Sequence, residues 1–165
     1  MRIRPYKNQD YDTIAQWITD ERIHALWCGN ITPYPLEKKA FEEMLQIVEA
    51  KYGDHPFVAE TEDGQMAGFF CFSQKENTNE GMFKFVVIDN TVRNRGYGCE
   101  MIRLAAKNAF ETRQLDRVCL NVYSANPGAK KCYERAGFKE ESYKENGIMF
   151  HTENWGMYHM ILNRC

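Results

Sequence analysis

The sequence contains no long apolar run and no excess of charge of one sign. Of its 165 residues, 44% are hydrophobic and 27% are charged, and the formal net charge is -2. No window approaches the length of a membrane span, and the opening residues Met1–Tyr6 include two arginines where a signal peptide would be apolar. The charge balance provides no basic field for nucleic acid or anionic lipid. We therefore expect a single cytoplasmic domain over residues 1–165, with no nucleic acid and no membrane as a partner.

Paired cysteines and clustered histidines are also absent. The six cysteines include no Cys-x-x-Cys pair, and the four histidines are scattered, with no carboxylate at ligand spacing. Four of the cysteines fall within apolar patterns, where a free thiol behaves as a small hydrophobe. We therefore expect buried or incidental thiols, and neither a metal site nor a disulfide framework.

Apolar periodicity predicts the order of the secondary structure elements. Strands are predicted at residues 3–6, 56–62, 65–73, 81–89, 118–122, 138–144 and 155–162. Helices are predicted after Asn8 or Asp10, around residues 41–48, at residues 96–113 and from Pro127. The stretch His24–Pro35 is expected to be irregular, because a glycine and two prolines interrupt it. This order predicts an α/β (α+β mixed) fold, a mixed sheet with helices packed on both faces.

A glycine-rich turn follows the predicted strand at residues 81–89. The residues Arg93-Asn94-Arg95-Gly96-Tyr97-Gly98 run directly into a predicted helix. The first amides of a helix have no helical partner and lie at the positive end of its dipole, so such a turn can bind a phosphate. The third glycine of a dinucleotide fingerprint is missing, and no Gly-Lys-Ser/Thr follows as a Walker loop requires. A purely structural turn is the alternative interpretation.

A second motif lies at the start of the next predicted helix. The residues Asn126-Pro127-Gly128-Ala129 open this helix, and Tyr133 follows seven positions after Asn126. Seven positions are about two helical turns, so the two side chains can face the same groove. Tyr133 also lies on an apolar stripe, where an aromatic residue of the core is the alternative interpretation.

Together these two motifs resemble the GNAT superfamily of N-acetyltransferases, over about Gly81 to Phe138. The resemblance implies a mixed, largely antiparallel central sheet of about seven strands, with helices on both faces and a splayed groove for acetyl-CoA, the acyl donor. The pattern of Tyr143, Gly147, Trp155 and Met160 is also weakly similar to the ribosomal-protein N-terminal acetyltransferase branch and its small-amine relatives. The acceptor implied is a primary amine, on a small molecule or a protein N-terminus.

The resemblance also implies roles for individual residues. The strand at residues 85–88 should pair with the pantetheine arm, and the glycine-rich turn should hold the pyrophosphate. Asn126 should contact the pantetheine, and Tyr133 should be the catalytic residue, which points at the thioester sulfur. The implied residues of the acyl-donor site are Val86, Val87, Ile88, Arg93, Asn94, Arg95, Gly96, Tyr97, Gly98, Asn126 and Tyr133.

The general base is not defined by the sequence. Some acetyltransferases place a glutamate early on the fourth strand, but this strand has Met82-Phe83-Lys84 there. Glu80, Asp89, His151 and a water relay are the open alternatives. Without a base, an α-amino group or a small amine of lowered pKa should be a better acceptor than a lysine side chain.

Acceptor recognition is expected from aromatic residues outside the two motifs, namely Trp27, Tyr34, Trp155 and Tyr158, since loops on a rigid scaffold often carry specificity. Ordinary aromatic packing is the alternative for all four. Two further functions stay open: a non-catalytic acyl-CoA-binding sensor, and a transferase of another acyl group. The oligomeric state is open as well, with a homodimer as one possibility.

Overall fold

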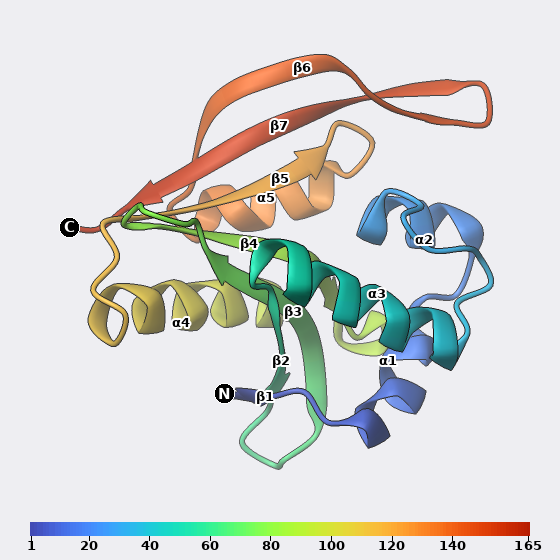
Figure 1. The fold of residues 1–165 in the computed structure, drawn as a ribbon, viewed down its shortest axis with the longest axis horizontal. Coiled ribbons are helices and arrows are strands. Elements are labelled where there is room, and N and C mark those ends of the chain that lie inside the picture. The colour runs from blue at the N-terminus through green and yellow to red at the C-terminus, as the bar shows by residue number, and fades with distance from the viewer.

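The computed structural model describes all residues from Met1 to Cys165 and contains one seven-stranded sheet, with the order β1-β2-β3-β4-β5-β7-β6 (Figure 1). The strands are β1 (Arg2–Pro5), β2 (His55–Glu60), β3 (Met66–Gln74), β4 (Glu80–Ile88), β5 (Arg117–Tyr123), β6 (Lys139–Phe150) and β7 (Glu153–Asn163). Only β4 and β5 are parallel neighbours, and every other pair is antiparallel. The predicted mixed, largely antiparallel sheet is confirmed.

Five α-helices cover the two faces of this sheet (Figure 1). They are α1 (Tyr11–Trp17), α2 (Glu21–Cys28), α3 (Lys38–Tyr52), α4 (Tyr97–Glu111) and α5 (Pro127–Arg135). Successive side chains of β3 point to opposite faces of the sheet and pack with different helices. Phe70 and Phe72 pack with α4 and α5, whereas Phe69 and Cys71 pack with α1, α2 and α3. A strand that is apolar on both faces is typical of a central, doubly covered position.

The structure corrects the expectation that residues 24–35 are irregular. Their first part belongs to α2, so three α-helices rather than two precede β2. The Asp20 carboxylate accepts a hydrogen bond from the Ile23 amide at 2.8 Å and caps this helix, and Gly29 ends it at φ +60°. The expectation was wrong because it rested on the glycine and prolines and overlooked the cap. Only the part after Gly29 is irregular.

The C-terminal hairpin is longer than its apolar pattern indicated. β6 continues past the predicted end at Lys144 to Phe150, with a register shift between Lys144 and Ile148. Its far end packs on α2, where Ala25 meets Phe150 and Trp155. Arg22 of α2 also pairs with Glu153 at 2.6 Å. The hairpin therefore fixes the position of α2. No helix is both long and apolar enough to cross a membrane.

Candidate active site

The central parallel pair of strands separates at one end. β4 and β5 are paired only from Glu80 and Arg117 to Phe83 and Leu120, although β4 continues to Ile88. Beyond this point the carboxyl ends of the two strands diverge, which is the place where open sheets of this kind bind ligands. A cavity of about 380 Å³ lies there, bounded by β4, the turn before α4, α5 and α2.

A β-bulge in β4 marks the start of the separation. Lys84 is opposite Cys71 and Val87 is opposite Phe69, so two residues of β4 face one residue of β3. The first of the two, Phe85, has φ +52°, and its carbonyl accepts a hydrogen bond from Trp27 Nε1 at 2.8 Å. After the bulge, the backbone groups of β4 that face β5 have no strand partner. They are available to an extended ligand.

The turn before α4 presents free amides to the same cavity. Gly96 has φ +84°, a conformation that favours glycine, and α4 begins without a side-chain cap. The first helical hydrogen bond is donated by the Glu100 amide to the Gly96 carbonyl at 2.9 Å. The amides of Tyr97, Gly98 and Cys99 are therefore left without helical partners at the positive end of the dipole. This arrangement suits an anion.

Gly98 allows three elements to meet beside these amides. A Cβ atom at this position would lie 3.2 Å from Ile88 Cγ1 on β4 and 3.3 Å from Cys132 Sγ on α5. A larger side chain would therefore push the start of α4 away from both. The α5 helix, in contrast, is capped, because Asn126 accepts a hydrogen bond from the Ala129 amide at 3.2 Å. The Asn126 side chain thus stabilises its own helix as well as lining the cavity.

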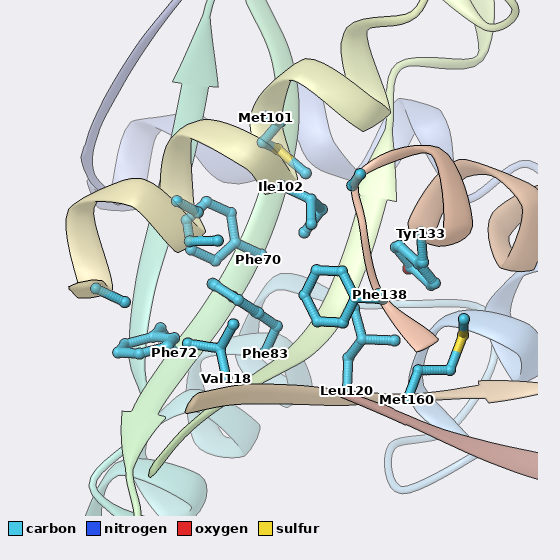
Figure 2. Close-up of a cluster of buried hydrophobic side chains, with 14 of the residues drawn as sticks. Phe70, Phe72, Phe83, Met101, Ile102, Val118, Leu120, Tyr133, Phe138 and Met160 are labelled. Carbon is cyan, nitrogen blue, oxygen red and sulfur yellow. The ribbon is translucent and has the colours of Figure 1, made fainter. Parts of the chain in front are cut away.

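Tyr133 lies on the cavity side of α5 with its ring in the core. It is 6% exposed, and its ring centroid is 6.3 Å from that of Phe138. Figure 2 shows the two rings side by side. Its hydroxyl has no hydrogen-bond partner within the protein, and burial raises the pKa of the phenol, with a smaller contribution from Cys132. The phenol therefore stays protonated at neutral pH, as a hydrogen-bond donor with no partner of its own.

Cys132 lies in the same cavity next to Tyr133. Burial raises the pKa of its thiol to about 11, and the neighbouring Cys99 adds to this effect. At neutral pH the sulfur is therefore a thiol, whereas a nucleophilic cysteine requires the thiolate. A covalent acyl-cysteine is for this reason not favoured at this position.

Most of the residues expected at an acyl-donor site are brought together in this cavity. Those that line it are Val86, Val87, Ile88, Arg93, Asn94, Gly96, Tyr97, Gly98, Asn126 and Tyr133. Arg95 lies outside it, in a neighbouring groove over α4. The sequence reasoning missed Ile23 and Leu26, which close the cavity from α2. Their spacing of three, with Trp27 next, was the signal that could have found them.

The four expected acceptor residues are separated in space. Trp27 lines the cavity, although its indole is held by the Phe85 carbonyl. Tyr34 is 41% exposed and packs its ring on His24, at a centroid distance of 5.5 Å. Trp155 is 2% exposed and stacks on Phe150, at 4.8 Å. Tyr34, Trp155 and Tyr158 do not line the cavity. Trp155 packs the hairpin against α2, and Tyr158 packs on Tyr143 at a centroid distance of 4.6 Å.

None of the candidate bases lines the cavity, and neither does any other carboxylate or imidazole. Asp89 accepts hydrogen bonds from the amide and the hydroxyl of Thr91, both at 2.8 Å. His151 is in the turn of the C-terminal hairpin, 3.1 Å from Glu21. The lining groups are therefore unable to act as a direct carboxylate or histidine base.

Glu80 lies at the opposite, paired end of β4. It accepts hydrogen bonds from Lys75, Arg117 and the Cys119 thiol, and these outweigh its burial and lower its pKa to about 2. A carboxylate of such low pKa is a weak base. The carboxylate, Cys119 and His159 have potential ligand atoms within 4.8 Å of one another. Lys75 and Arg117 both pair with this carboxylate.

The chain is similar in sequence to a known family and to a characterised relative. Residues 1–139 match the family described as acetyltransferase (GNAT) domain. Over 90 residues the chain is 27% identical to the 5-NmdU N-acetyltransferase of Pseudomonas phage PaMx11, an alignment that spans 54% of this chain and 61% of that enzyme. The chain therefore covers less than two thirds of that relative.

Solved structures share the fold over nearly the whole chain. The spermidine N-acetyltransferase of Vibrio cholerae, in complex with CoA and spermine, superimposes with a TM-score of 0.82 at 20% identity, covering 98% of this chain and 94% of that one. A dodecameric structure of spermidine N-acetyltransferase from the same organism gives a TM-score of 0.74 at 19% identity, covering 98% and 92%.

Proposed function

Because the chain belongs to the GNAT family of acetyltransferases, we propose that it transfers an acetyl group from acetyl-CoA directly to a primary amine. One observation carries the proposal: the separated end of β4, the uncapped start of α4 and the Tyr133 side of α5 line a single cavity. These three parts offer unpaired strand backbone, free helical amides and an unpartnered phenol. Each matches one part of the donor, namely the pantetheine amides, the pyrophosphate and the sulfur.

The residues present fit this donor. The amides of Tyr97, Gly98 and Cys99 would hold the pyrophosphate, with Arg93 as a nearby cation. The β4 backbone at residues 86–88 would pair with the pantetheine, and Asn126 would lie beside it. The apolar side chains of Ile23 and Leu26 would exclude water at the acetyl end. Held in this way, the thioester would be oriented for an attacking amine.

Transfer forms a C–N bond and breaks the C–S bond. The amine lone pair attacks the thioester carbonyl, the electron pair of the C–S bond leaves on sulfur, and the amine releases a proton. Proton transfer from an unperturbed phenol of pKa about 10 to a thiolate of pKa near 8.5 would be unfavourable by roughly 2 kcal/mol. Burial raises the pKa of Tyr133 further, so its role is a hydrogen bond to the developing thiolate. The proton released by the amine then neutralises the sulfur.

The acceptor amine has to be neutral when it attacks. At pH 7 the loss of a proton costs about 4.6 kcal/mol for an alkyl amine of pKa 10.4, and about 1.4 kcal/mol for an α-amino group of pKa near 8. No carboxylate or imidazole lines the cavity to offset the larger cost. We therefore propose an acceptor whose amine has a lowered pKa, deprotonated by solvent or through a water relay.

Among such acceptors, a small-molecule amine is favoured over a peptide N-terminus. The solved relative named above acts on spermidine. In a polyamine the ammonium groups repel one another, so the last groups to be protonated have lowered pKa values. This chemistry suits a site without a base. Trp27 is the residue proposed to border the acceptor, because it alone of the four expected aromatic residues lines the cavity.

The test is thiol release from acetyl-CoA with spermidine, an N-terminally free peptide and an N-terminally blocked peptide that contains lysine, each from pH 7 to pH 9. We expect kcat/KM at pH 7 to be highest for spermidine and lowest for the blocked peptide. The difference in kcat/KM between these two acceptors should become smaller as the pH rises. A preference for the lysine peptide at pH 7 would show that a base exists. Tight acetyl-CoA binding with no thiol release for any amine would favour the sensor.

A further inference from the structure

A second groove continues from the acyl-donor cavity over the outer face of α4. It has a volume of about 740 Å³ and shares Gly96, Cys99 and Arg135 with that cavity. The two hollows therefore meet at the glycine-rich turn. The second groove lies on the side of the turn away from Tyr133, since neither Tyr133 nor any residue of β4 lines it.

Four cationic side chains line this groove: Arg95, Arg103, Lys107 and Arg135. The one carboxylate in the lining, Glu100, is 3.4 Å from the amino group of Met1. None of the four cations forms an ion pair with an acidic side chain, although the chain as a whole has a net charge of -2. Clustered like charges repel one another, and a bound anion removes that cost.

The helix itself aligns these charges. Glu100, Arg103 and Lys107 are three and four positions apart on the outer face of α4, whereas Met101 and Ile102 point into the core (Figure 2). Arg103 also donates a hydrogen bond to the Arg135 carbonyl at the end of α5. Its guanidinium is thereby held in the groove rather than free in solvent. Arg103 lies about 9 Å along the helix axis from Tyr97, and Lys107 about one turn further.

The chemistry of the donor accounts for such a groove. Beyond its pyrophosphate, CoA carries an adenosine whose ribose bears a 3′-phosphate, a dianion near neutral pH. If the pyrophosphate binds the free amides of α4 and the thioester lies at Tyr133, the nucleotide must leave the cavity on the opposite side of the turn. The second groove begins there.

We propose, on the basis of the function proposed above, that this groove binds the 3′-phosphate of CoA, with Arg103 as its main ligand and Lys107, Arg95 and Arg135 completing the positive surface. A guanidinium offers a planar pair of donors to a phosphate, which a single ammonium does not. The groove therefore makes the enzyme selective for CoA over 3′-dephospho-CoA. The glycine-rich turn cannot make this distinction, because both molecules carry the same pyrophosphate.

Calorimetry with CoA and 3′-dephospho-CoA tests the proposal on the full chain. We expect the parent to bind CoA at least tenfold more tightly than the dephosphorylated molecule. Arg103→Gln should reduce this ratio to below about threefold by weakening CoA alone, and Lys107→Gln should reduce it less. Lys131→Gln removes a cation from α5 outside both cavities and should leave the ratio unchanged.

Three outcomes would overturn the proposal, and they differ in meaning. Equal affinity of the parent for the two molecules would show that the 3′-phosphate is not recognised, while the proposed acyl-donor site stands. Equal weakening of both molecules in Arg103→Gln, with a lowered Tm, would show a structural role for this arginine. Failure of the parent to bind either molecule would reject the proposed function together with this inference.

Discussion

The two ends of the β4–β5 pair are built in opposite ways. At the first end, Glu80 to Phe83 pair with β5, and the Glu80 carboxylate is held by Lys75 and Arg117. At the second end, beyond the bulge at Phe85, the β4 backbone has no β5 partner and borders a cavity. The comparison shows where a ligand can contribute hydrogen bonds. A ligand has little to add where charges and backbone are satisfied, and much to add where they are not.

The bulge forms the border between the two ends. The bulge requires a positive φ at Phe85 and turns the Phe85 carbonyl out of the sheet ladder, and both cost free energy. The Trp27 indole offsets part of this cost by donating a hydrogen bond to that carbonyl. Variants at the open end, the closed end and the border separate these contributions when each is compared with a matched control variant.

The largest effect is expected from Gly96→Glu at the open end. A carboxylate would be placed beside the expected pyrophosphate, at a position with φ +84°. Calorimetry should show acetyl-CoA affinity reduced at least a hundredfold. Gly64→Glu is the control, because Gly64 has φ +80° and equally open surroundings in the β2–β3 turn. It should share the backbone strain and retain the affinity. Equal loss in both variants would contradict a phosphate site at Gly96.

Tyr133→Phe should separate catalysis from binding at the open end. Loss of one hydrogen bond made mainly in the transition state should lower kcat by roughly 10- to 1000-fold and change acetyl-CoA affinity only a few-fold. Because burial raises the pKa of Tyr133, the parent should show no loss of kcat from this group up to about pH 10. Tyr143→Phe, on the exposed face of β6, is the control. An unchanged kcat with a lowered Tm would make Tyr133 a core residue only.

Glu80→Gln should affect the closed end and leave the open end intact. We expect the free energy of unfolding at pH 7 to fall by about 1–2 kcal/mol, since the lysine and arginine partners are partly exposed, with kcat/KM unchanged. The folded pKa of Glu80, about 2, is below its ordinary value of 4.5. Its stabilisation is therefore complete above pH 4.5 and lost as the pH falls toward 2.

Urea unfolding at pH 7 and at pH 3 measures this effect. The difference in stability between the parent and Glu80→Gln should shrink at the lower pH. The control is Glu76→Gln, in the exposed turn nearby. A fall in kcat/KM for Glu80→Gln at unchanged stability would instead restore this carboxylate as a base.

The smallest effect is expected at the border, from Trp27→Phe. Removal of the indole donor leaves the Phe85 carbonyl without its partner and should raise the KM for acetyl-CoA about two- to fivefold. Trp17→Phe, in the same core cluster, is the control, because it removes a similar apolar volume away from the bulge. Both variants should lose stability, but only the first should change KM. Equal KM values for the parent and Trp27→Phe would show that the bulge does not depend on the hydrogen bond from Trp27 to Phe85.

The sequence predicted those parts of the candidate site whose residues are close along the chain. The glycine-rich turn and the Asn126–Tyr133 spacing each lie within one strand-turn-helix or helix segment, so local geometry places them without knowledge of the fold. The seven strands and four of the five α-helices were predictable for the same reason, since each has its own periodicity, whereas α2 was missed.

The remaining parts depend on contacts between distant residues. Trp27 and Phe85 are 58 positions apart, and no glycine marks the positive φ of Phe85, so nothing in the local sequence indicated the bulge. The alternation of β7 indicates that the Trp155 side chain is either buried or faces a ligand. Only the position of α2, which packs on Trp155, distinguishes the two. Glu80 was a candidate base until its cationic partners were located in space.

The bulge also has a consequence for how this gene can change. Phe83 faces the α4 side of the sheet, Phe85 faces the α2 side, and Val86 and Ile88 return to the α4 side. The bulge holds one extra residue, so loss of one codon there would restore simple alternation and leave the later residues of β4 on their present faces. Loss of a codon elsewhere in β4 would move the residues on one side of the deletion to the opposite face of the sheet. Substitutions within the strand would cost packing, whereas an insertion or deletion outside the bulge would exchange its two surfaces. We therefore expect descendants of this gene to vary in the composition of β4 and to keep its length outside the bulge, with other length changes confined to turns such as residues 75–79.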